Sequence, residues 1–427
     1  MSSFVDLGVC KELCDVCQEL GWKKPTEIQS KVIRVALSGK DINLLAKPRY
    51  NYALILTPTR ELAMQIRQHF IDLGSKFGLQ VICLVGGQHV EDQQRALKQT
   101  KHHIIVGTPG RVLHHIEHTK ELILHKLHYF VLDEADHLLG GNFETELNVI
   151  LSRLPDKRKT YLFSATMSKN LEKVQSACLR MPVRLETASK YTTVQNLDHA
   201  FVFLPDQRKD IYVAKLLVDL GGSTTSESRT IVFVATARES ILVGEMLRHI
   251  TSKDGVVILN GSMPQEKRVS ALQKFKSSEA NILVATDVAS RGLDIPEVQL
   301  VINYDVPSNP TSWSEAAKSY IHRVGRTARA GRPGRAITLV TPYSVTRLRI
   351  IESVLGTLIP QLAWVDPTRT DSQLIRLIDE ASIHAKSVLR LNDKRQKQLE
   401  ARRAKRRRLG PEVDGNESHP DDFDEEA

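Results

Sequence analysis

The chain has 427 residues, 41% of them hydrophobic, which is enough for two or three domains with sizeable cores. No run of about 18 apolar residues predicts a membrane span, and the first residues show no signal-peptide pattern. The net charge of +9 fits a polyanionic partner without identifying one. Five cysteines without framework spacing indicate reduced thiols in the cytosol or nucleus.

Short, nearly continuous apolar runs recur along the chain and predict strands that are buried on both faces of a parallel sheet. In chain order these runs are Ala53–Leu56, Ile104–Val106, Phe130–Leu132, Tyr161–Phe163, Thr230–Val234, Val256–Leu259, Ile282–Ala285, Leu300–Ile302 and Ala336–Val340. Helical patterns separate them, for example at Arg60–Leu73 and Gln265–Phe275. The alternation of strand and helix predicts a doubly wound α/β fold.

Two polar, turn-rich stretches, at 186–197 and 221–226, lie between the two sets of strands. The first is the better linker, and the second is predicted to be a loop inside the following domain. Near the end, a basic run from Lys394 to Arg408 precedes an acidic segment from Asp421 to Glu426. Such blocks are typical of disordered tails. The basic run fits a nuclear-import or RNA-contacting segment, or else a solvated helical extension.

Two adjacent carboxylates, Asp133 and Glu134, follow the apolar run Phe130–Leu132. In open α/β sheets, ligands bind beyond the carboxyl ends of the strands. One carboxylate at such a place can hold hydrated Mg²⁺, and its neighbour can activate a water molecule. For this segment alone, the alternative interpretation is acidic charge at the N-terminus of a helix.

Other motifs follow other predicted strands, and their order favours the catalytic interpretation. They read PTRELA from Pro58, TPGR from Thr108, SAT from Ser164, ATDVASRGLD from Ala285 and HRVGRTAR from His322. From Phe4 to about Val340, this ordered set resembles the DEAD-box ATP-dependent RNA helicases of superfamily 2. The resemblance implies two RecA-like doubly wound parallel-sheet lobes, the first incomplete, and a disordered charged C-terminal tail.

The resemblance also implies how the chain is divided and what it does. We expect a Q-motif region at 1–30, an ATP-binding lobe at 31–190, a helicase C-terminal lobe at 195–365, a helical extension at 366–390 and a basic then acidic tail at 391–427. The family hydrolyses ATP to ADP and phosphate while it separates short RNA duplexes or remodels RNA–protein particles. Similarity spread over the chain is greatest to the nucleolar helicases of pre-ribosomal RNA processing. It implies RNA and pre-ribosomal particles as partners, no membrane, and a nuclear, nucleolar location.

Matching positions take the roles that the family gives them, with ATP and Mg²⁺ as cofactors. For the nucleotide, Phe4 would stack on the base, Gln29 would read adenine and Asp294 would contact the ribose. Asp133 would hold Mg²⁺ through water, and Glu134 would orient the attacking water. The remaining catalytic positions are those that couple ATP to RNA, Ser164 and Thr166, and the two arginine fingers, Arg326 and Arg329.

The RNA positions combine glycines, which admit a backbone closely, with groups that contact phosphates and sugars. They are Arg60, Gly86, Gly87, Thr108, Gly110, Arg111, Gln265, Arg268, Thr286 and Gly292. Without these neighbours, Gly86 and Gly87 would be interpreted as a loop turn. His114, His115 and His118 lack the further ligands of a zinc site, so we expect them on a solvated helix face.

One part of the family pattern is missing, the phosphate-binding loop G-x-x-x-x-G-K-[ST]. Gly39-Lys40-Asp41 corresponds to the residues before the first strand, and only ten residues separate Ile42 from Ala53. A crossover between parallel strands needs at least about 10–12 residues, helix included. The ten residues must also contain the rest of the first strand, so there is no room for the loop and its helix. An excised block at Ile42–Asn43 explains the gap, and a long connection between Pro307 and Tyr320 points the same way.

Three interpretations of this gap remain open: an active helicase gene product, a catalytically impaired RNA-binding splice form, and a mis-predicted gene structure. Lys47 is a poor substitute for the loop lysine, because it precedes Pro48 and lacks both glycines and a following hydroxyl. We therefore expect weak or absent ATP hydrolysis. The first lobe should also be less stable, with an apolar face uncovered.

Overall fold

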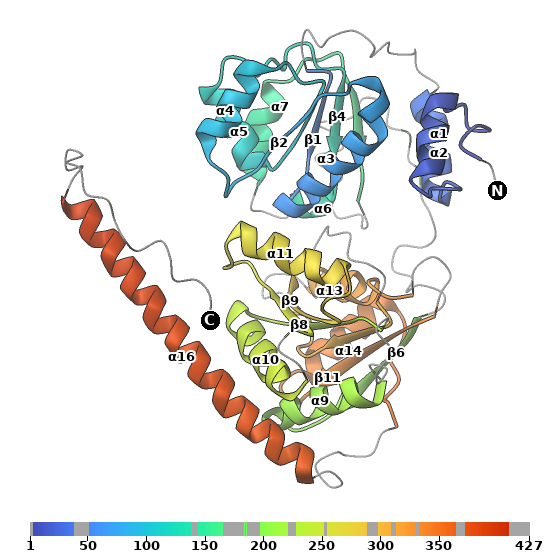
Figure 1. Ribbon diagram of the computed structural model, residues 1–427. Helices are drawn as coiled ribbons and strands as arrows, with labels where there is room; N and C mark the ends of the chain where they lie inside the picture. Colours follow the sequence, from blue (N-terminus) through green and yellow to red (C-terminus); the bar gives the residue numbers. More distant parts are fainter. Residues whose placement is uncertain are drawn as a thin grey trace.

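The computed structural model describes residues 3–37, 51–138, 143–164, 183, 185, 197–220, 228–251, 254–287, 298–308, 313–328, 333–363 and 372–409. Within these residues, two parallel sheets form two α/β lobes, one above the other in Figure 1. The junction at Ile42–Asn43 and the residues of the predicted linker from 186 to 196 lie outside the described residues. Among the described helices, none combines the length and apolar character that a membrane crossing requires.

The first lobe contains a sheet in the order β2-β3-β1-β4-β5, in which every pair is parallel. The strands are β1 (Ala53–Leu56), β2 (Val81–Leu84), β3 (Ile104–Gly107), β4 (Tyr129–Leu132) and β5 (Lys159–Leu162). The helices of this lobe are α3 (Arg60–Gly74), α4 (Val90–Gln99), α5 (Pro109–His118), α6 (Ala135–Leu138) and α7 (Glu144–Ser152), with a short 3-10 turn at Ser75–Phe77. Leu54, Ile105 and Phe130 are fully buried on the central strands and form the core of this lobe.

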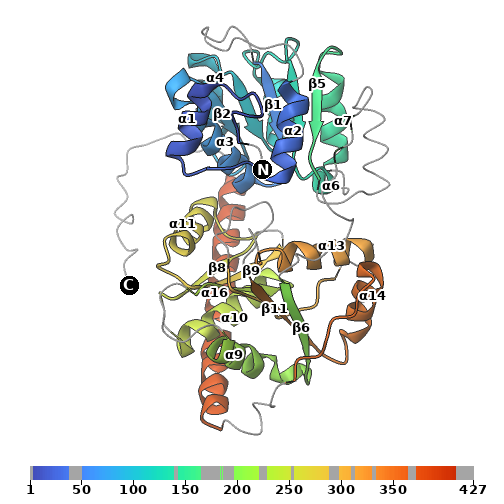
Figure 2. The ribbon, with the colours of Figure 1, turned by 90° about the vertical axis from the view of Figure 1, so that its right-hand side faces the viewer.

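Two N-terminal helices, α1 (Lys11–Glu19) and α2 (Glu27–Leu37), lie at one side of the first lobe, beside it in Figure 1 and in front of it in Figure 2. Trp22 packs edge-on against His69 of α3, and Lys76 pairs with Glu19 at 2.5 Å. Although α2 is amphipathic, none of its residues is buried. Its apolar side chains are therefore only partly covered by the residues that the structure describes.

The second lobe contains a parallel sheet in the order β6-β11-β10-β7-β9-β8. Its strands are β6 (Leu197–Phe203), β7 (Thr230–Val234), β8 (Val256–Leu259), β9 (Ile282–Thr286), β10 (Leu300–Asn303) and β11 (Gly334–Val340). Its helices are α9 (Lys209–Leu220), α10 (Ala237–Ile250), α11 (Gln265–Lys276), α13 (Trp313–Val324) and α14 (Val345–Leu355), with a 3-10 turn at Asp206–Arg208. Apolar clusters fill both faces of this sheet.

All nine predicted apolar runs overlap strands, and the predicted doubly wound parallel architecture is confirmed. Two further strands, β2 and β6, were not among the runs named above. β6 lies at the sheet edge, where partly exposed and buried residues alternate, so it lacks a continuous apolar run. The predicted helices at Arg60–Leu73 and Gln265–Phe275 correspond to α3 and α11.

The predicted end of the helical extension at residue 390 is wrong, because one helix, α16 (Ser372–Leu409), continues through the basic run. Lysine, arginine, glutamine, glutamate, alanine and leucine all favour helix, and the next residues, Gly410 and Pro411, are the first helix breakers. The first half of α16 docks on the second lobe, where Ala381 and Ala385 are buried with residues of α9 and α10. Ser382 donates a hydrogen bond to Asp210 at 3.0 Å.

Replacement of Ala385 by arginine tests this docking. The position is 1% exposed, and overpacking a buried position costs about 1–3 kcal/mol. We expect Ala385→Arg to lower the urea midpoint of the second lobe, measured by circular dichroism. Ile383→Arg is the matched control, because Ile383 lies on the same helix with 66% of its surface exposed. Equal midpoints in the two variants would contradict the docking of α16.

Candidate nucleic-acid interface and nucleotide site

The parallel sheet of the first lobe brings the predicted motifs to one edge, because each motif follows the carboxyl end of a strand. Thr59, after β1, caps α3 by accepting a hydrogen bond from Leu62 N at 3.3 Å. This cap places Arg60 in the first turn of α3. Thr108, after β3, is the N-cap residue of α5, and Pro109 occupies the first turn. Asp133, after β4, is joined to β1 by its backbone N–H, which donates to Leu56 O at 3.0 Å.

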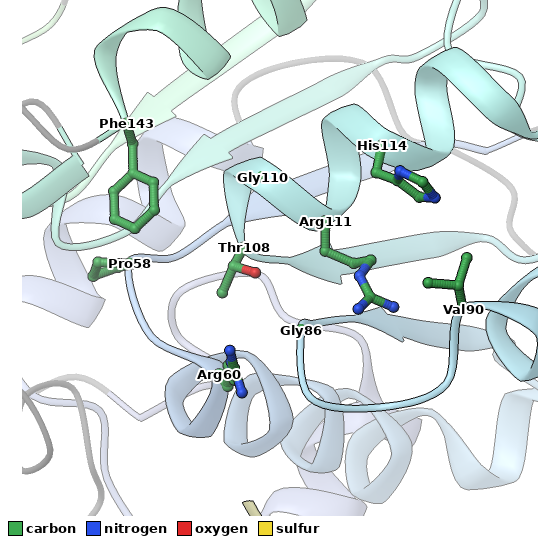
Figure 3. A pocket seen from close by; sticks show the side chains of 9 residues that line it. All are labelled: Pro58, Arg60, Gly86, Val90, Thr108, Gly110, Arg111, His114 and Phe143. Carbon is green, nitrogen blue, oxygen red and sulfur yellow. The ribbon is translucent and has the colours of Figure 1, made fainter. Parts of the chain in front are cut away.

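A cavity of about 430 Å³ opens at this edge (Figure 3). Its lining includes five of the predicted RNA residues: Arg60, Gly86, Thr108, Gly110 and Arg111. Arg60 comes from α3 and Arg111 from α5, and Figure 3 shows both guanidinium groups at the same cavity. Three segments that are far apart in the sequence therefore meet in one cationic hollow, as their shared strand-end positions predict.

Gly86 and Gly87 lie against the guanidinium group of Arg60. Gly87 has a φ of +81°, which favours glycine, and a Cβ at this position would collide with Arg60 Nη1. A Cβ at Gly86 would lie 3.1 Å from Arg60 Nη2. The pair does form a turn, as the alternative interpretation holds, but this turn also admits the Arg60 side chain.

Arg111 is held by two acceptors on its own lobe. Its Nη1 donates to Gln88 O at 3.1 Å and to Gln93 Oε1 at 3.2 Å. Burial lowers the pKa of Arg111, and the positive charge of nearby Arg60 lowers it further. A phosphate group between the two guanidinium groups would relieve both penalties, since it supplies the opposite charge.

The expectation that the histidines of α5 lie on a solvated face is wrong for His115, which is fully buried. Its ring bonds to Gln93 Oε1 at 2.9 Å and to Thr119 Oγ1 at 3.0 Å, and burial lowers its pKa to about 4. His118 is exposed, as expected. His115 therefore supports Gln93, which in turn holds Arg111.

Four further residues line the cavity but were not assigned to the RNA site from the sequence: Pro58, Val90, His114 and Phe143. His114 lies three positions after Arg111 on one helix, so helical spacing could have placed both on one face. Val90 and Phe143 carry no such signal, because only the packing of α4 and the start of α7 brings them to the cavity.

Gln265 and Arg268 of the second lobe contact the first lobe through one carboxylate, that of Glu61 on α3. Arg268 Nη2 and Gln265 Nε2 each lie 2.9 Å from Glu61 Oε1. The Glu61 side chain is only 4% exposed and that of Arg268 is 10% exposed. Burial lowers the pKa of Arg268, and the charge of Glu61 opposes that shift. Glu61 was assigned no role from the sequence, since acidic charge in the first turn of a helix needs no further explanation.

The acidic pair after β4 has an unusual backbone. Glu134 has a φ of +49°, and its N–H donates to Asp133 Oδ1 at 3.0 Å. Left-handed backbone at a residue other than glycine costs about 1–3 kcal/mol and is concentrated at functional sites. Burial raises the pKa of Asp133, and the charge of Asp136 adds to the rise. Ala135 N bonds to Phe163 O at 2.9 Å, which ties the acidic segment to the strand end that precedes Ser164.

The two predicted base contacts lie in the N-terminal segment. Gln29 forms a capping box with Thr26, because Thr26 N donates to Gln29 Oε1 at 2.8 Å and Gln29 N donates to Thr26 Oγ1 at 3.4 Å. The glutamine is exposed and its carbonyl is engaged in capping α2. Phe4 is partly buried in the turn that precedes α1.

In the second lobe, Arg326 follows α13 and is partly exposed, and Thr286 is buried at the end of β9. Arg323 was assigned no separate role from the sequence. It anchors α13 by donating to Asp287 from Nε at 2.5 Å and from Nη2 at 2.8 Å. Its Nη1 also donates to Asp305 O at 2.7 Å. Four predicted site residues lie outside the described part of the chain: Thr166, Gly292, Asp294 and Arg329.

Replacement of Glu61 by glutamine tests the contact between the lobes. Loss of one partner from a buried ion pair costs about 3–5 kcal/mol, because the other charge stays buried. Separation of the lobes would relieve that cost, so we expect Glu61→Gln to increase the radius of gyration of the RNA-free protein in small-angle X-ray scattering. Glu117→Gln, a change on the exposed side of α5, is the control. An unchanged radius in Glu61→Gln would show that this pair does not hold the lobes together.

Comparison with known proteins agrees with these observations. A model of the DEAD/DEAH box helicase family matches residues 42–174, and one of the helicase conserved C-terminal domain matches residues 208–331. The probable ATP-dependent RNA helicase DDX47 of Homo sapiens is 42% identical over 417 residues, which cover 92% of this chain and 88% of that protein. The ATP-dependent rRNA helicase RRP3 of Coccidioides immitis is 45% identical over 375 residues, or 83% of this chain and 76% of that protein.

Among solved structures, Saccharomyces cerevisiae Dbp5 bound to RNA and ADP BeF3 is similar to this chain, with a TM-score of 0.74 and 26% identity. The match covers 91% of this chain and 100% of that one. Both lobes, the order of the motifs and the full-length relatives thus agree: the chain belongs to the DEAD-box family of ATP-dependent RNA helicases.

Proposed function

We propose that this chain binds RNA through the sugar-phosphate backbone, at the cationic cavity of the first lobe and the facing side of α11. The observation that carries the proposal is the convergence of Arg60, Arg111 and the N-terminus of α5 on one hollow. Guanidinium groups and the amides of a helix N-terminus suit phosphate oxygens. Such contacts fix the position of a nucleic acid without reading its bases, so binding should depend little on sequence.

Gln265 and Arg268 belong to the same proposed RNA surface. A Cβ at Gly87 would lie 3.6 Å from Gln265 Cβ, so α11 lies beside the glycine turn of the first lobe. Without RNA, the two side chains share the carboxylate of Glu61. RNA that spans both lobes would offer them phosphate and ribose oxygens in its place.

We also propose that Asp133 holds Mg²⁺ through water and that Glu134 orients a water molecule. The raised pKa of Asp133 shows that burial and Asp136 disfavour its charged form, and a divalent cation would reverse that balance. When bound, the ion would neutralise phosphate charge. Ser164, Thr166, Arg326 and Arg329 keep the roles implied by the family as part of this proposal.

The residues of this chain do not fit the triphosphate of ATP. No G-x-x-x-x-G-K-[ST] sequence is present to supply the amide nest and the lysine. We infer that the chain hydrolyses ATP weakly or not at all, whereas its RNA surface is intact. This combination favours an RNA-binding form that competes with a complete helicase.

The biological setting follows from the relatives. DDX47 is named an RNA helicase and RRP3 an rRNA helicase. We propose that this chain acts in ribosomal RNA processing in the nucleolus, with pre-ribosomal particles as partners. The basic second half of α16 is consistent with nuclear import or with additional contacts to RNA.

RNA affinity tests the proposed surface. We expect Arg60→Ala and Arg111→Ala each to weaken binding about tenfold, since hydrogen bonds to charged groups are worth about 1.5–3 kcal/mol. The loss should be equal for two labelled single strands of unrelated sequence in fluorescence anisotropy, with a shallower salt dependence. Arg95→Ala is the control, because Arg95 pairs with Asp92 on exposed α4. Sequence-dependent losses, or an equal loss in the control, would count against a backbone-binding surface.

Insertion of the missing block tests the proposed loss of ATP hydrolysis. The residues that human DDX47 carries at this place would be inserted between Ile42 and Asn43, and phosphate release would be measured with and without RNA. We expect RNA-stimulated hydrolysis only in the chain with the insertion, and its loss on Glu134→Gln. RNA-stimulated hydrolysis by the chain without the insertion, abolished by Glu134→Gln, would refute the proposal.

A further inference from the structure

Three metal-binding side chains meet where α6 of the first lobe faces α13 of the second. Ligand atoms of Asp136, His137 and His322 all lie within 4.8 Å of one another. His137 Nε2 is 3.4 Å from His322 Nδ1, and the two ring planes are inclined at 63°. Both ribbon views place α6 at the end of its lobe nearest the second lobe, with α13 opposite (Figures 1 and 2).

The chemistry of this cluster differs from that of the Asp133 site. Asp136 is 5% exposed, so its carboxylate is removed from bulk water. Hard cations such as Mg²⁺ prefer sets of oxygen ligands. Two imidazoles with one carboxylate suit a transition metal instead, and Zn²⁺ binds tetrahedrally to histidine nitrogens and carboxylate oxygens.

We propose that Asp136, His137 and His322 bind one divalent transition-metal ion of the Zn²⁺ type, and that this ion links the two lobes. Three protein ligands leave a fourth position for water. The third ligand stands on a well-fixed helix, since Arg323, the residue after His322, is anchored to Asp287 and Asp305. The first two ligands lie on α6, which the Ala135–Phe163 hydrogen bond fixes to the sheet.

The consequence is a metal-dependent bias toward the arrangement in which the lobes are close. His322 reaches the ion only when the lobes face each other, so the ion binds that arrangement and shifts the population toward it. The effect depends on no nucleotide, because the ligand groups are all side chains of this chain. It is therefore independent of the missing phosphate-binding loop.

Two other histidine pairs provide internal controls. His114 and His118 stack with ring centroids 4.4 Å apart, and His249 and His384 stack at 5.1 Å. Within the described residues, neither pair belongs to a group of three or more close ligand side chains. Each pair lies inside a single lobe, so a metal ion bound there would not join the two lobes.

Titration of the full, purified chain with Zn²⁺ alone tests the site, by calorimetry and by the visible absorption of Co²⁺ as a substitute. Mutation of a residue that only supports a metal ligand weakens metal binding by about 10- to 100-fold. Removal of a ligand itself should cost more, so we expect at least about 100-fold weaker Zn²⁺ binding in His137→Asn and in His322→Asn. His322→Cys should keep the affinity, because thiolate also binds Zn²⁺. The double variant His114→Asn/His118→Asn should bind like the unmodified chain.

The link between the lobes is tested separately by small-angle X-ray scattering. Zn²⁺ should reduce the radius of gyration of the unmodified chain and of His322→Cys, but not of His137→Asn. Circular dichroism checks that each variant is folded. If His322→Cys keeps the Zn²⁺ affinity, then the loss in His322→Asn results from the missing ligand and not from unfolding. Equal Zn²⁺ affinity in all variants, a loss confined to His114→Asn/His118→Asn, or dependence on His137 without His322 would each overturn the proposal.

Discussion

Parallel pairing of the strands is the constraint on which the function of this protein depends. In both lobes every named strand runs in the same direction, so every carboxyl end lies at one edge of its sheet. Segments as distant in sequence as those after β1 and β3 are thereby brought to one cavity with Arg60 and Arg111. Burial of the apolar strands stabilises the fold. The polar residues that follow the strands lie at the sheet edge, where they can bind ligands.

The contact between the lobes has two centres with different chemistry. On the side of α3 and α11, Glu61 holds Gln265 and Arg268 in a nearly dry ionic cluster. On the side of α6 and α13, His137 and His322 meet next to the buried Asp136. Removal of one partner from a buried ion pair is costly, whereas a pair of imidazoles can bind a metal ion. RNA would compete with the first contact, and a transition metal would strengthen the second.

Because the phosphate-binding loop is missing, membership of the family does not by itself imply that this chain hydrolyses ATP. The ordered motifs and the two lobes persist without it, because each lobe is held by its own apolar clusters. In the family pattern, this loop supplies the amides and the lysine that bind phosphate.

The sequence by itself determined the fold class, nine of the eleven described strands and five of the nine residues that line the cavity of the first lobe. Continuous apolar runs such as Thr230–Val234 can be buried only between two layers, and motif residues that follow strands must share an edge. It also predicted the gap at Ile42–Asn43, since ten residues that must also complete a strand leave no room for a crossover. The helix α16 extends past the predicted end at residue 390, because the helix propensity of the residues there outweighs the repulsion among their positive charges.

Only the tertiary structure decided the roles of residues whose partners lie far away in the chain. Glu61 could not be linked to Arg268, nor His137 to His322, because those pairs depend on how the two lobes face each other. The burial of His115 depends in the same way on the packing of α5 against Gln93. The periodicity of apolar residues predicts which face of a helix or strand is buried. It does not predict which side chain of another element packs against that face.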